Sequence, residues 1–419
     1  MIDSRVALKS AAVDLATDPA RAKMIDEKGN LELKRWLVLL LSAALGACAA
    51  TPASRQEADR LFNDQAFVPP SVRINAADVF ALSPEMKRYI ETDVARLVHL
   101  RGRQHGLFDA LYDRAQLKLE YDAGMTRNAA EAFAARAGNC LSLVIMTAAF
   151  AKEMDFTIRY QNVFTDETWS RDGDFYLSIG HVNLSLVRKR VEDAMTRNDG
   201  DSMTIDFLPP ADLRGARTWA IDEPTIIAMY MNNRAVESLT SGRMDDAYWW
   251  AREAILQDPR FMSAYNTLGV VYQRHGNLAE AKRAFDFILE REPANTRAMS
   301  NLALVLHDQG NMAAALELTR KLERMEPNPP FGYFKRGLAA MQESDYKTAK
   351  EMFTKEVDRA AYYHEFHFWL ALAYVGLGEM EPARKHMTIA VENSTTRKDH
   401  DLYAAKLGRI QAMVPVLRR

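Results

Sequence analysis

A period of 34 residues runs through the C-terminal half of the chain, and this period constrains the fold more than any other feature. Two series of small residues and one series of turn formers repeat at this step. They are Ala247, Ala281, Ala315, Ala349 and Ala383; Ala235, Gly269, Ala303, Gly337 and Ala371; and Gly242, Gly276, Gly310, Ser344 and Gly378. Such a period predicts stacked helical hairpins, because one hairpin cannot bury its apolar face alone.

Each residue series has an expected place in a helical hairpin. Small residues are expected where the two helices cross closely, and glycine in the turn between them. Pro259, Pro293 and Pro327 are expected to stop the second helix of the first three units, whereas Ala361 and Thr395 stand at the same place in the last two. The pattern resembles the tetratricopeptide repeat. We therefore predict five repeats over residues 221–397 and a C-terminal capping helix over 398–419.

This resemblance implies an array that binds a protein or peptide partner along its concave face. By helical spacing we expect that face to include Asn232, Asn266, Arg274, Arg297, Phe334 and Met341. The alternative for each of these residues is a solvated position or a packing position inside the array.

The overall charge and the cysteine content exclude several classes of protein. A chain of 419 residues is long enough for more than one domain, and its formal net charge of −2 is nearly neutral. Nucleic-acid-binding faces are strongly basic, so no nucleic-acid partner is expected. Two cysteines exclude a disulfide-rich scaffold, and no Cys/His cluster has the spacing of a zinc site. We predict neither a metal nor another cofactor.

Residues 1–48 have the pattern of an N-terminal extension followed by a secretion signal. Lys34 and Arg35 precede an apolar stretch of 15 residues, whereas a spanning helix needs roughly 20. Leu45-Gly46-Ala47-Cys48 resembles the bacterial lipobox, which implies that Cys48 is acylated and becomes the mature N-terminus. We expect translation to start at Met24. The alternative is an uncleaved helix in which Cys48 is an incidental apolar residue.

An acylated Cys48 places the protein in the bacterial cell envelope. We expect a lipid anchor in the outer membrane, with the rest of the chain facing the periplasm. Residues 49–70 then form a tether, because residues 49–64 contain Thr, Pro, Ser and charged residues.

Residues 71–220 differ from the repeats and are expected to form a separate domain. Residues 76–136 indicate several helices with polar faces. Gly138 and Asn139 then favour a turn, and the uncharged run 141–151 predicts a buried helix. Cys140 lies in the first turn of that helix, where the helix dipole and the free N–H groups favour a thiolate and can hold an oxyanion.

Three strands are expected after this helix, because the apolar residues then alternate. They cover residues 156–163, 177–187 and 203–210. In the second strand His181, Asn183 and Ser185 share one face, and Val182, Leu184 and Leu186 share the other. Asp206 is expected in the middle of the third strand.

The order Cys140, His181, Asp206 resembles the transglutaminase-like, papain-type superfamily, which has an α+β fold. Thr126-Arg127, shortly before the cysteine, resembles the bacterial members that carry tetratricopeptide repeats. The resemblance implies that Cys140 attacks a carbonyl carbon, that His181 transfers the proton and that Asp206 orients the imidazole. It leaves open whether the acyl group passes to water or to an amine. Gln161 and Trp169 are candidates for the second oxyanion donor by residue type alone.

The leading hypothesis is a membrane-anchored cysteine acyl-transfer enzyme whose repeats recruit a protein partner or substrate. A buried cysteine can also be an inert apolar residue, His181 a core histidine and Asp206 the end of a strand. The rival hypothesis is therefore a non-catalytic periplasmic scaffold with an inactive transglutaminase-like domain. A third hypothesis is an intracellular enzyme with an uncleaved N-terminus.

Overall fold

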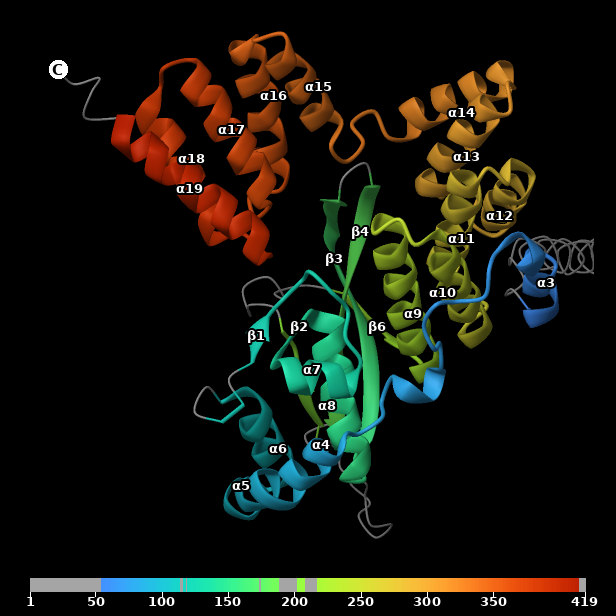
Figure 1. Ribbon diagram of the computed structural model, residues 1–419, viewed down its shortest axis with the longest axis vertical. Coiled ribbons are helices and arrows are strands. Elements are labelled where there is room, and N and C mark those ends of the chain that lie inside the picture. Colours follow the sequence, from blue (N-terminus) through green and yellow to red (C-terminus); the bar gives the residue numbers. More distant parts are fainter. Residues whose placement is uncertain are drawn as a thin grey trace, which may run out of the picture. The chain divides into compact units, whose positions relative to one another are not determined.

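The computed structural model describes residues 54–113, 116–117, 119–172, 175–187, 202–207 and 217–413. The predicted signal with Cys48, and the first part of the predicted tether, lie outside the described residues. The described residues contain a mixed α/β region followed by a helical array (Figure 1). No helix within these ranges combines the length and hydropathy needed to cross a membrane.

The first part of the α/β region is helical, as the sequence predicts for residues 76–136. α4 (Pro84–Tyr89), a π-helical turn (Ile90–Val94) and α5 (Ala95–Arg101) follow one another without a break. Gly102 then ends the run with a φ of 80°, and α6 (Arg103–Tyr112) begins.

Two short paired strands precede Cys140 in the chain. β1 (Glu120–Tyr121) pairs in parallel with β2 (Ala137–Gly138), and α7 (Ala129–Ala135) lies between them in the chain. Asn128 and Glu131 form a capping box that starts α7. The pairing holds Tyr121 opposite Gly138, directly before the helix that carries the cysteine.

A four-stranded antiparallel sheet follows α8 (Cys140–Glu153). Its strands are β3 (Thr157–Asp172), β4 (Phe175–Val187), β5 (Ser202–Ile205) and β6 (Arg217–Ile221), in the order β5-β4-β3-β6. α8 lies against β4 and β3 (Figure 1). The sequence predicts the first two strands and misses β6. It also misplaces Asp206: β5 ends at Ile205, so Asp206 follows the strand instead of lying inside it.

The helical array consists of five helix pairs and a closing helix within residues 223–413. The pairs are α9 (Glu223–Thr240) with α10 (Met244–Gln257), α11 (Met262–His275) with α12 (Leu278–Arg291), α13 (Thr296–Asp308) with α14 (Met312–Met325), α15 (Gly332–Gln342) with α16 (Tyr346–Arg359), and α17 (His364–Gly376) with α18 (Met380–Glu392). The closing helix is α19 (Arg397–Met413), close to the range predicted for a cap.

The 34-residue turn series has one backbone conformation in all five pairs. Gly242, Gly276, Gly310 and Gly378 have φ values between 75° and 91°, and Ser344 has a φ of 59°. Glycine adopts this left-handed region without strain, whereas serine does not. The 34-residue period therefore marks a positive φ at the same place in each pair. In the fourth pair this place is occupied by Ser344, which is less suited to a positive φ than glycine is.

Small residues lie where the helices of a pair cross, as the period predicts. A Cβ on Gly269 would lie 2.6 Å from the ring of Phe285, and a Cβ on Gly337 would lie 2.5 Å from the ring of Phe353. Both rings are fully buried. The glycines thus let an aromatic ring of the second helix pack directly on the backbone of the first.

The second helix of each of the first three pairs stops two residues before its proline. α10, α12 and α14 end ahead of Pro259, Pro293 and Pro327. α16 ends at Arg359 although Ala361 replaces the proline there, so this helix ends without one.

Residues 54–72, which we call the N-terminal strap, are ordered along the first repeats. The strap opens with α3 (Arg55–Asp59), which Ser54 caps. Phe67 is buried and stacks on Tyr248 of α10 with ring centroids 4.0 Å apart. Asp245 of α10 accepts a hydrogen bond from the backbone N–H of Val68. This part of the predicted tether is therefore packed against the array.

Candidate active site at Cys140

Cys140 is the first residue of α8, as the sequence predicts. Asn139 is the N-cap, and its side chain accepts a hydrogen bond from the backbone N–H of Ser142. A Cβ on Gly138 would lie 2.7 Å from Cβ of Ser142, so this position requires glycine. In Gly138-Asn139-Cys140 the glycine thus allows the close approach of the chain, the asparagine caps the buried helix, and the cysteine lies in its first turn. Cys140 is half-buried and has no disulfide within the described part of the chain.

His181 and Asp206 lie together beside this thiol. Nε2 of His181 donates a hydrogen bond of 2.6 Å to Oδ1 of Asp206, and the two side chains are 7% and 9% exposed. Cys140 lies close enough to His181 to be among the groups that raise the pKa of its ring. Because Nε2 is used by Asp206, Nδ1 is the ring nitrogen left for the sulfur. The structure therefore brings the three predicted residues together, with a hydrogen bond between His181 and Asp206.

The electrostatics of His181 follow from these contacts. Burial alone lowers the pKa of His181, because it disfavours the charged ring. The hydrogen bonds to Asp206 and Cys140, together with the negative charges of these two residues, outweigh burial and raise the pKa to about 9. The site thus favours a protonated imidazole between two acidic groups.

Asn183 belongs to the site, although the sequence pattern alone assigned it no role. Its Nδ2 donates a hydrogen bond of 2.7 Å to Oδ2 of Asp206, so each carboxylate oxygen has its own donor. Ser185, the next residue on that face, bonds to Thr204 of β5 at 2.8 Å. The signal was present in the alternation of β4, because His181, Asn183 and Ser185 form a polar row. All three are buried, so a row of this kind needs partners.

The surroundings of Cys140 include Tyr121. Desolvation raises the pKa of Tyr121 above its ordinary value, and the negative charges of Cys140 and Asp122 raise it further. Of the two candidates for the second oxyanion donor, Gln161 is half-buried on β3 and pairs with Asn183, not with His181. The side chain of Trp169 lies outside the described part of the structure.

The residues predicted for the concave face have different surroundings. Asn232 accepts a hydrogen bond from Thr267, and Asn266 accepts one from Asn301, so both link neighbouring helices. Phe334 is fully buried in the core of the fourth pair, and Met341 packs against that core. The prediction that Phe334 faces a partner is therefore wrong, because α15 uses this ring for internal packing.

Two further residues predicted for that face are the arginines. Arg274 is exposed near the end of α11, and Arg297 is half-buried in the first turn of α13. Across the described ranges, no group of three His, Cys, Asp or Glu side chains is arranged to hold a metal ion.

Comparison with known proteins matches the helical array. A family model described as Tetratricopeptide repeat matches residues 266–330 and 334–397. TPR repeat-containing protein YvcD of Bacillus subtilis (strain 168) is 26% identical over 210 residues, which cover 47% of this chain and 42% of YvcD. This chain therefore spans less than half the length of that relative.

Several solved structures are also similar to this chain. A thermophilic protein of Thermus thermophilus is 20% identical, covering 43% of this chain and 98% of that protein, with a TM-score of 0.30. YrrB, described as a TPR protein with an unusual peptide-binding site, is 20% identical, covering 43% and 92%, with a TM-score of 0.23. PilF of Pseudomonas aeruginosa is 19% identical, covering 44% and 84%, with a TM-score of 0.29. These TM-scores are too low to support an argument about shape.

The family match and the observed helix pairs agree with the 34-residue period. Tetratricopeptide repeats generally bind protein or peptide partners. The C-terminal half of this chain is an array of tetratricopeptide repeats.

Proposed function

We propose that the chain is a cysteine acyl-transfer enzyme of the transglutaminase-like type, with a repeat array that recruits its protein partner or substrate. One observation carries the proposal: a half-buried thiol at a helix N-terminus lies beside His181 and raises the pKa of its ring, and Asp206 holds that ring by a hydrogen bond. A cysteine kept only for packing has no need of such a chain of partners.

The reaction follows from the order of the three side chains. The Cys140 sulfur attacks a carbonyl carbon as a thiolate, with its proton already held by His181. The backbone N–H groups at the start of α8 stabilise the oxyanion that forms. His181 then gives the proton to the leaving amine as the C–N bond breaks, and a thioester remains. Water or a second amine attacks this thioester, which restores the thiol and gives hydrolysis or transamidation.

In this proposal the repeat array binds the protein partner or substrate. Tetratricopeptide repeats generally bind proteins or peptides, and YrrB is described as having a peptide-binding site of its own. A partner held by repeats in the same chain is presented to Cys140 at a raised effective concentration. We extend this role to the present chain as part of the proposal.

Membrane anchoring through Cys48 completes the proposed function. The lipobox-like residues before Cys48 support attachment of a lipid and a location in the bacterial cell envelope, at the outer membrane facing the periplasm. Labelled palmitate should enter the protein and be lost in Cys48→Ser, with Cys140→Ser as the matched control. Labelling that survives in Cys48→Ser contradicts the anchor.

Alkylation of the full chain tests the proposed nucleophile. Iodoacetamide labelling of the Cys140 peptide, followed by mass spectrometry, compares the folded chain with the same chain in urea. At pH 6.5 we expect the folded chain to react at least roughly tenfold faster, because thiolate is the reactive form. Equal rates contradict a catalytic cysteine.

The second candidate function is a scaffold without catalysis, and the family match favours it because tetratricopeptide repeats generally bind protein or peptide partners. A pull-down from envelope extracts with Cys140→Ala separates the two. An enzyme should leave its bound protein intact in the variant and altered with wild type, whereas a scaffold should leave it intact with both.

A further inference from the structure

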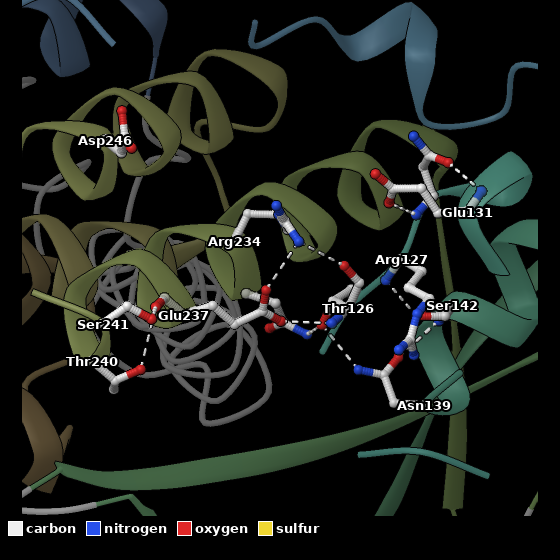
Figure 2. A network of polar contacts seen from close by, with 12 residues as sticks. Thr126, Arg127, Glu131, Asn139, Ser142, Arg234, Glu237, Thr240, Ser241 and Asp246 are labelled. Atoms are coloured by element: carbon white, nitrogen blue, oxygen red, sulfur yellow. Dashed lines mark hydrogen bonds and ion pairs between the residues drawn. The ribbon is translucent and has the colours of Figure 1, made fainter. Parts of the chain in front are cut away.

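Thr126 connects the first repeat helix to the helix that carries Cys140. This residue is 1% exposed, and each of its polar groups has a partner. Its backbone N–H donates to Oε1 of Glu237 at 2.6 Å, and its carbonyl accepts from Arg234 at 3.2 Å. Both partners belong to α9, so the loop before α7 is held by the repeat array (Figure 2).

The hydroxyl of Thr126 continues the connection to the cysteine. Oγ1 accepts a hydrogen bond of 2.9 Å from Nδ2 of Asn139 and one of 3.2 Å from Asn233 of α9. Asn139 is the N-cap of α8 and directly precedes Cys140. The next residue of the loop, Arg127, donates its backbone N–H to Oγ of Ser142 in the first turn of α8 (Figure 2). Two neighbouring loop residues therefore hold the start of this helix.

Glu237 is the charged centre of this network. Its Oε2 pairs with Arg234 at 3.3 Å while Oε1 holds Thr126, and its side chain is 25% exposed. Burial raises the pKa of Glu237, and the contacts with Thr126 and Arg234 oppose that rise. A half-buried carboxylate that accepts a short backbone hydrogen bond fixes its partner more firmly than a neutral acceptor does.

We propose that Glu237 is a positioning residue for Cys140, acting through Thr126 and the N-cap Asn139. The inference rests on the proposed function, since it concerns the alignment of the thiol and the N–H groups at the start of α8. It also gives the first repeat helix a role beyond recruitment. A small displacement of the thiol lowers the reaction rate, because catalysis depends on the alignment of the reacting groups.

The chain provides a matched control at the other end of α8. Glu223, also on α9, accepts hydrogen bonds from Lys152 near the end of α8 and from Tyr160 of β3. Glu223→Ala thus removes a glutamate contact between α9 and the far end of α8 without touching the N-cap. Glu237→Gln is the conservative variant, because its amide oxygen can still accept from the Thr126 N–H.

The experiment measures the rate at which iodoacetamide labels Cys140 in the full chain, read on the Cys140 peptide by mass spectrometry. We expect Glu237→Ala to lower this rate by roughly tenfold. Glu237→Gln should recover most of it, and Glu223→Ala should match wild type. Thr126→Val, which keeps the shape and removes the hydroxyl, should also slow labelling, and it decides the matter if Glu237→Ala does not fold.

The outcomes separate this inference from the proposed function. A role in stability alone would lower the melting temperature and leave the labelling rate of the folded chain unchanged. A fast wild-type rate that persists in Glu237→Ala and Thr126→Val overturns the inference only. A wild-type rate equal to that of the urea-denatured chain overturns the proposed function and the inference together.

Discussion

Nε2 of His181 lies 2.6 Å from Oδ1 of Asp206, and the two side chains come from β4 and from the residue after β5. β4 and β5 are paired neighbours, so the sheet itself sets this distance. The contact commits one ring nitrogen, Nε2, to the carboxylate. The histidine is therefore held in one orientation before any substrate arrives.

This arrangement predicts the titration of His181. Its pKa is raised to about 9, against burial, by hydrogen bonds and charges from Asp206 and Cys140. An NMR titration of the His181 ring should show a midpoint near that value in wild type. The midpoint should move down toward the ordinary histidine value in Asp206→Asn. A wild-type midpoint at or below the ordinary value would contradict the arrangement.

The same shift makes stability depend on pH. The folded chain binds the His181 proton more tightly than the unfolded chain does, because the pKa rises from 6.5 to about 9 on folding. The resulting stabilisation is complete below pH 6.5 and is lost as the pH rises through about 9. We expect the free energy of unfolding, measured in urea, to fall over this range. The fall should be smaller in Asp206→Asn.

Asn183 should matter to the site through Asp206. Asn183→Ala removes the hydrogen bond that Asn183 donates to Oδ2 of Asp206, and the loss of this buried hydrogen bond should cost about 1–3 kcal/mol of stability. It should also slow labelling of Cys140 by iodoacetamide, because the carboxylate is then held less firmly toward His181. Ser185→Ala is the control, since it removes a buried hydrogen bond of the same row that does not reach Asp206. Equal labelling in the two variants would show that Asn183 acts on stability alone.

Ser344 should be a weak point of the fourth helix pair. Its φ of 59° falls in the left-handed region. A residue with a Cβ destabilises the fold there by about 1 kcal/mol or more, whereas glycine adopts this conformation without strain. Ser344→Gly should therefore slow amide hydrogen exchange in α15 and α16. The reciprocal change Gly378→Ser should speed exchange in α17 and α18. Faster exchange in Ser344→Gly would mean that the serine side chain stabilises the turn.

Phe67 should hold the N-terminal strap in place. The ring is 6% exposed, and removing a buried phenylalanine side chain costs about 3–5 kcal/mol. We expect Phe67→Ala to release the strap, so that a protease cuts within residues 54–72 while the array stays intact. Val68→Ala is the neighbouring control, because Val68 is 65% exposed. Equal cleavage in the two variants would mean that polar contacts, and not the Phe67 ring, hold the strap on the array.

The sequence predicts those features that depend on local pattern. The repeats follow from a period, and the turn conformation at Gly242 or Gly378 follows from the need for a positive φ. The start of α8 follows from Gly138 and Asn139, since a tight approach and an N-cap are local requirements. His181 on a strand follows from alternation.

Features that depend on distant partners could not be predicted in this way. Asn183 has a role only because β5 brings Asp206 beside it, and Thr126 meets Glu237 across 111 residues of chain. The strap has no periodic pattern, because it is held by single contacts such as the stacking of Phe67 on Tyr248. Phe334 shows the converse: its helical position is compatible with a binding face, but tertiary packing buries it.

If Cys48 carries a lipid, the docked strap limits how far the protein can reach from the membrane. With a lipid on Cys48, as we propose, only residues 49–53 separate the anchor from Ser54, the N-cap of α3. A fully extended chain of this length spans about 20 Å. The start of the strap would then lie no farther than this distance from the bilayer surface. Releasing the strap at Phe67 would increase the distance that the first repeats can reach, without any change to the array or to the thiol.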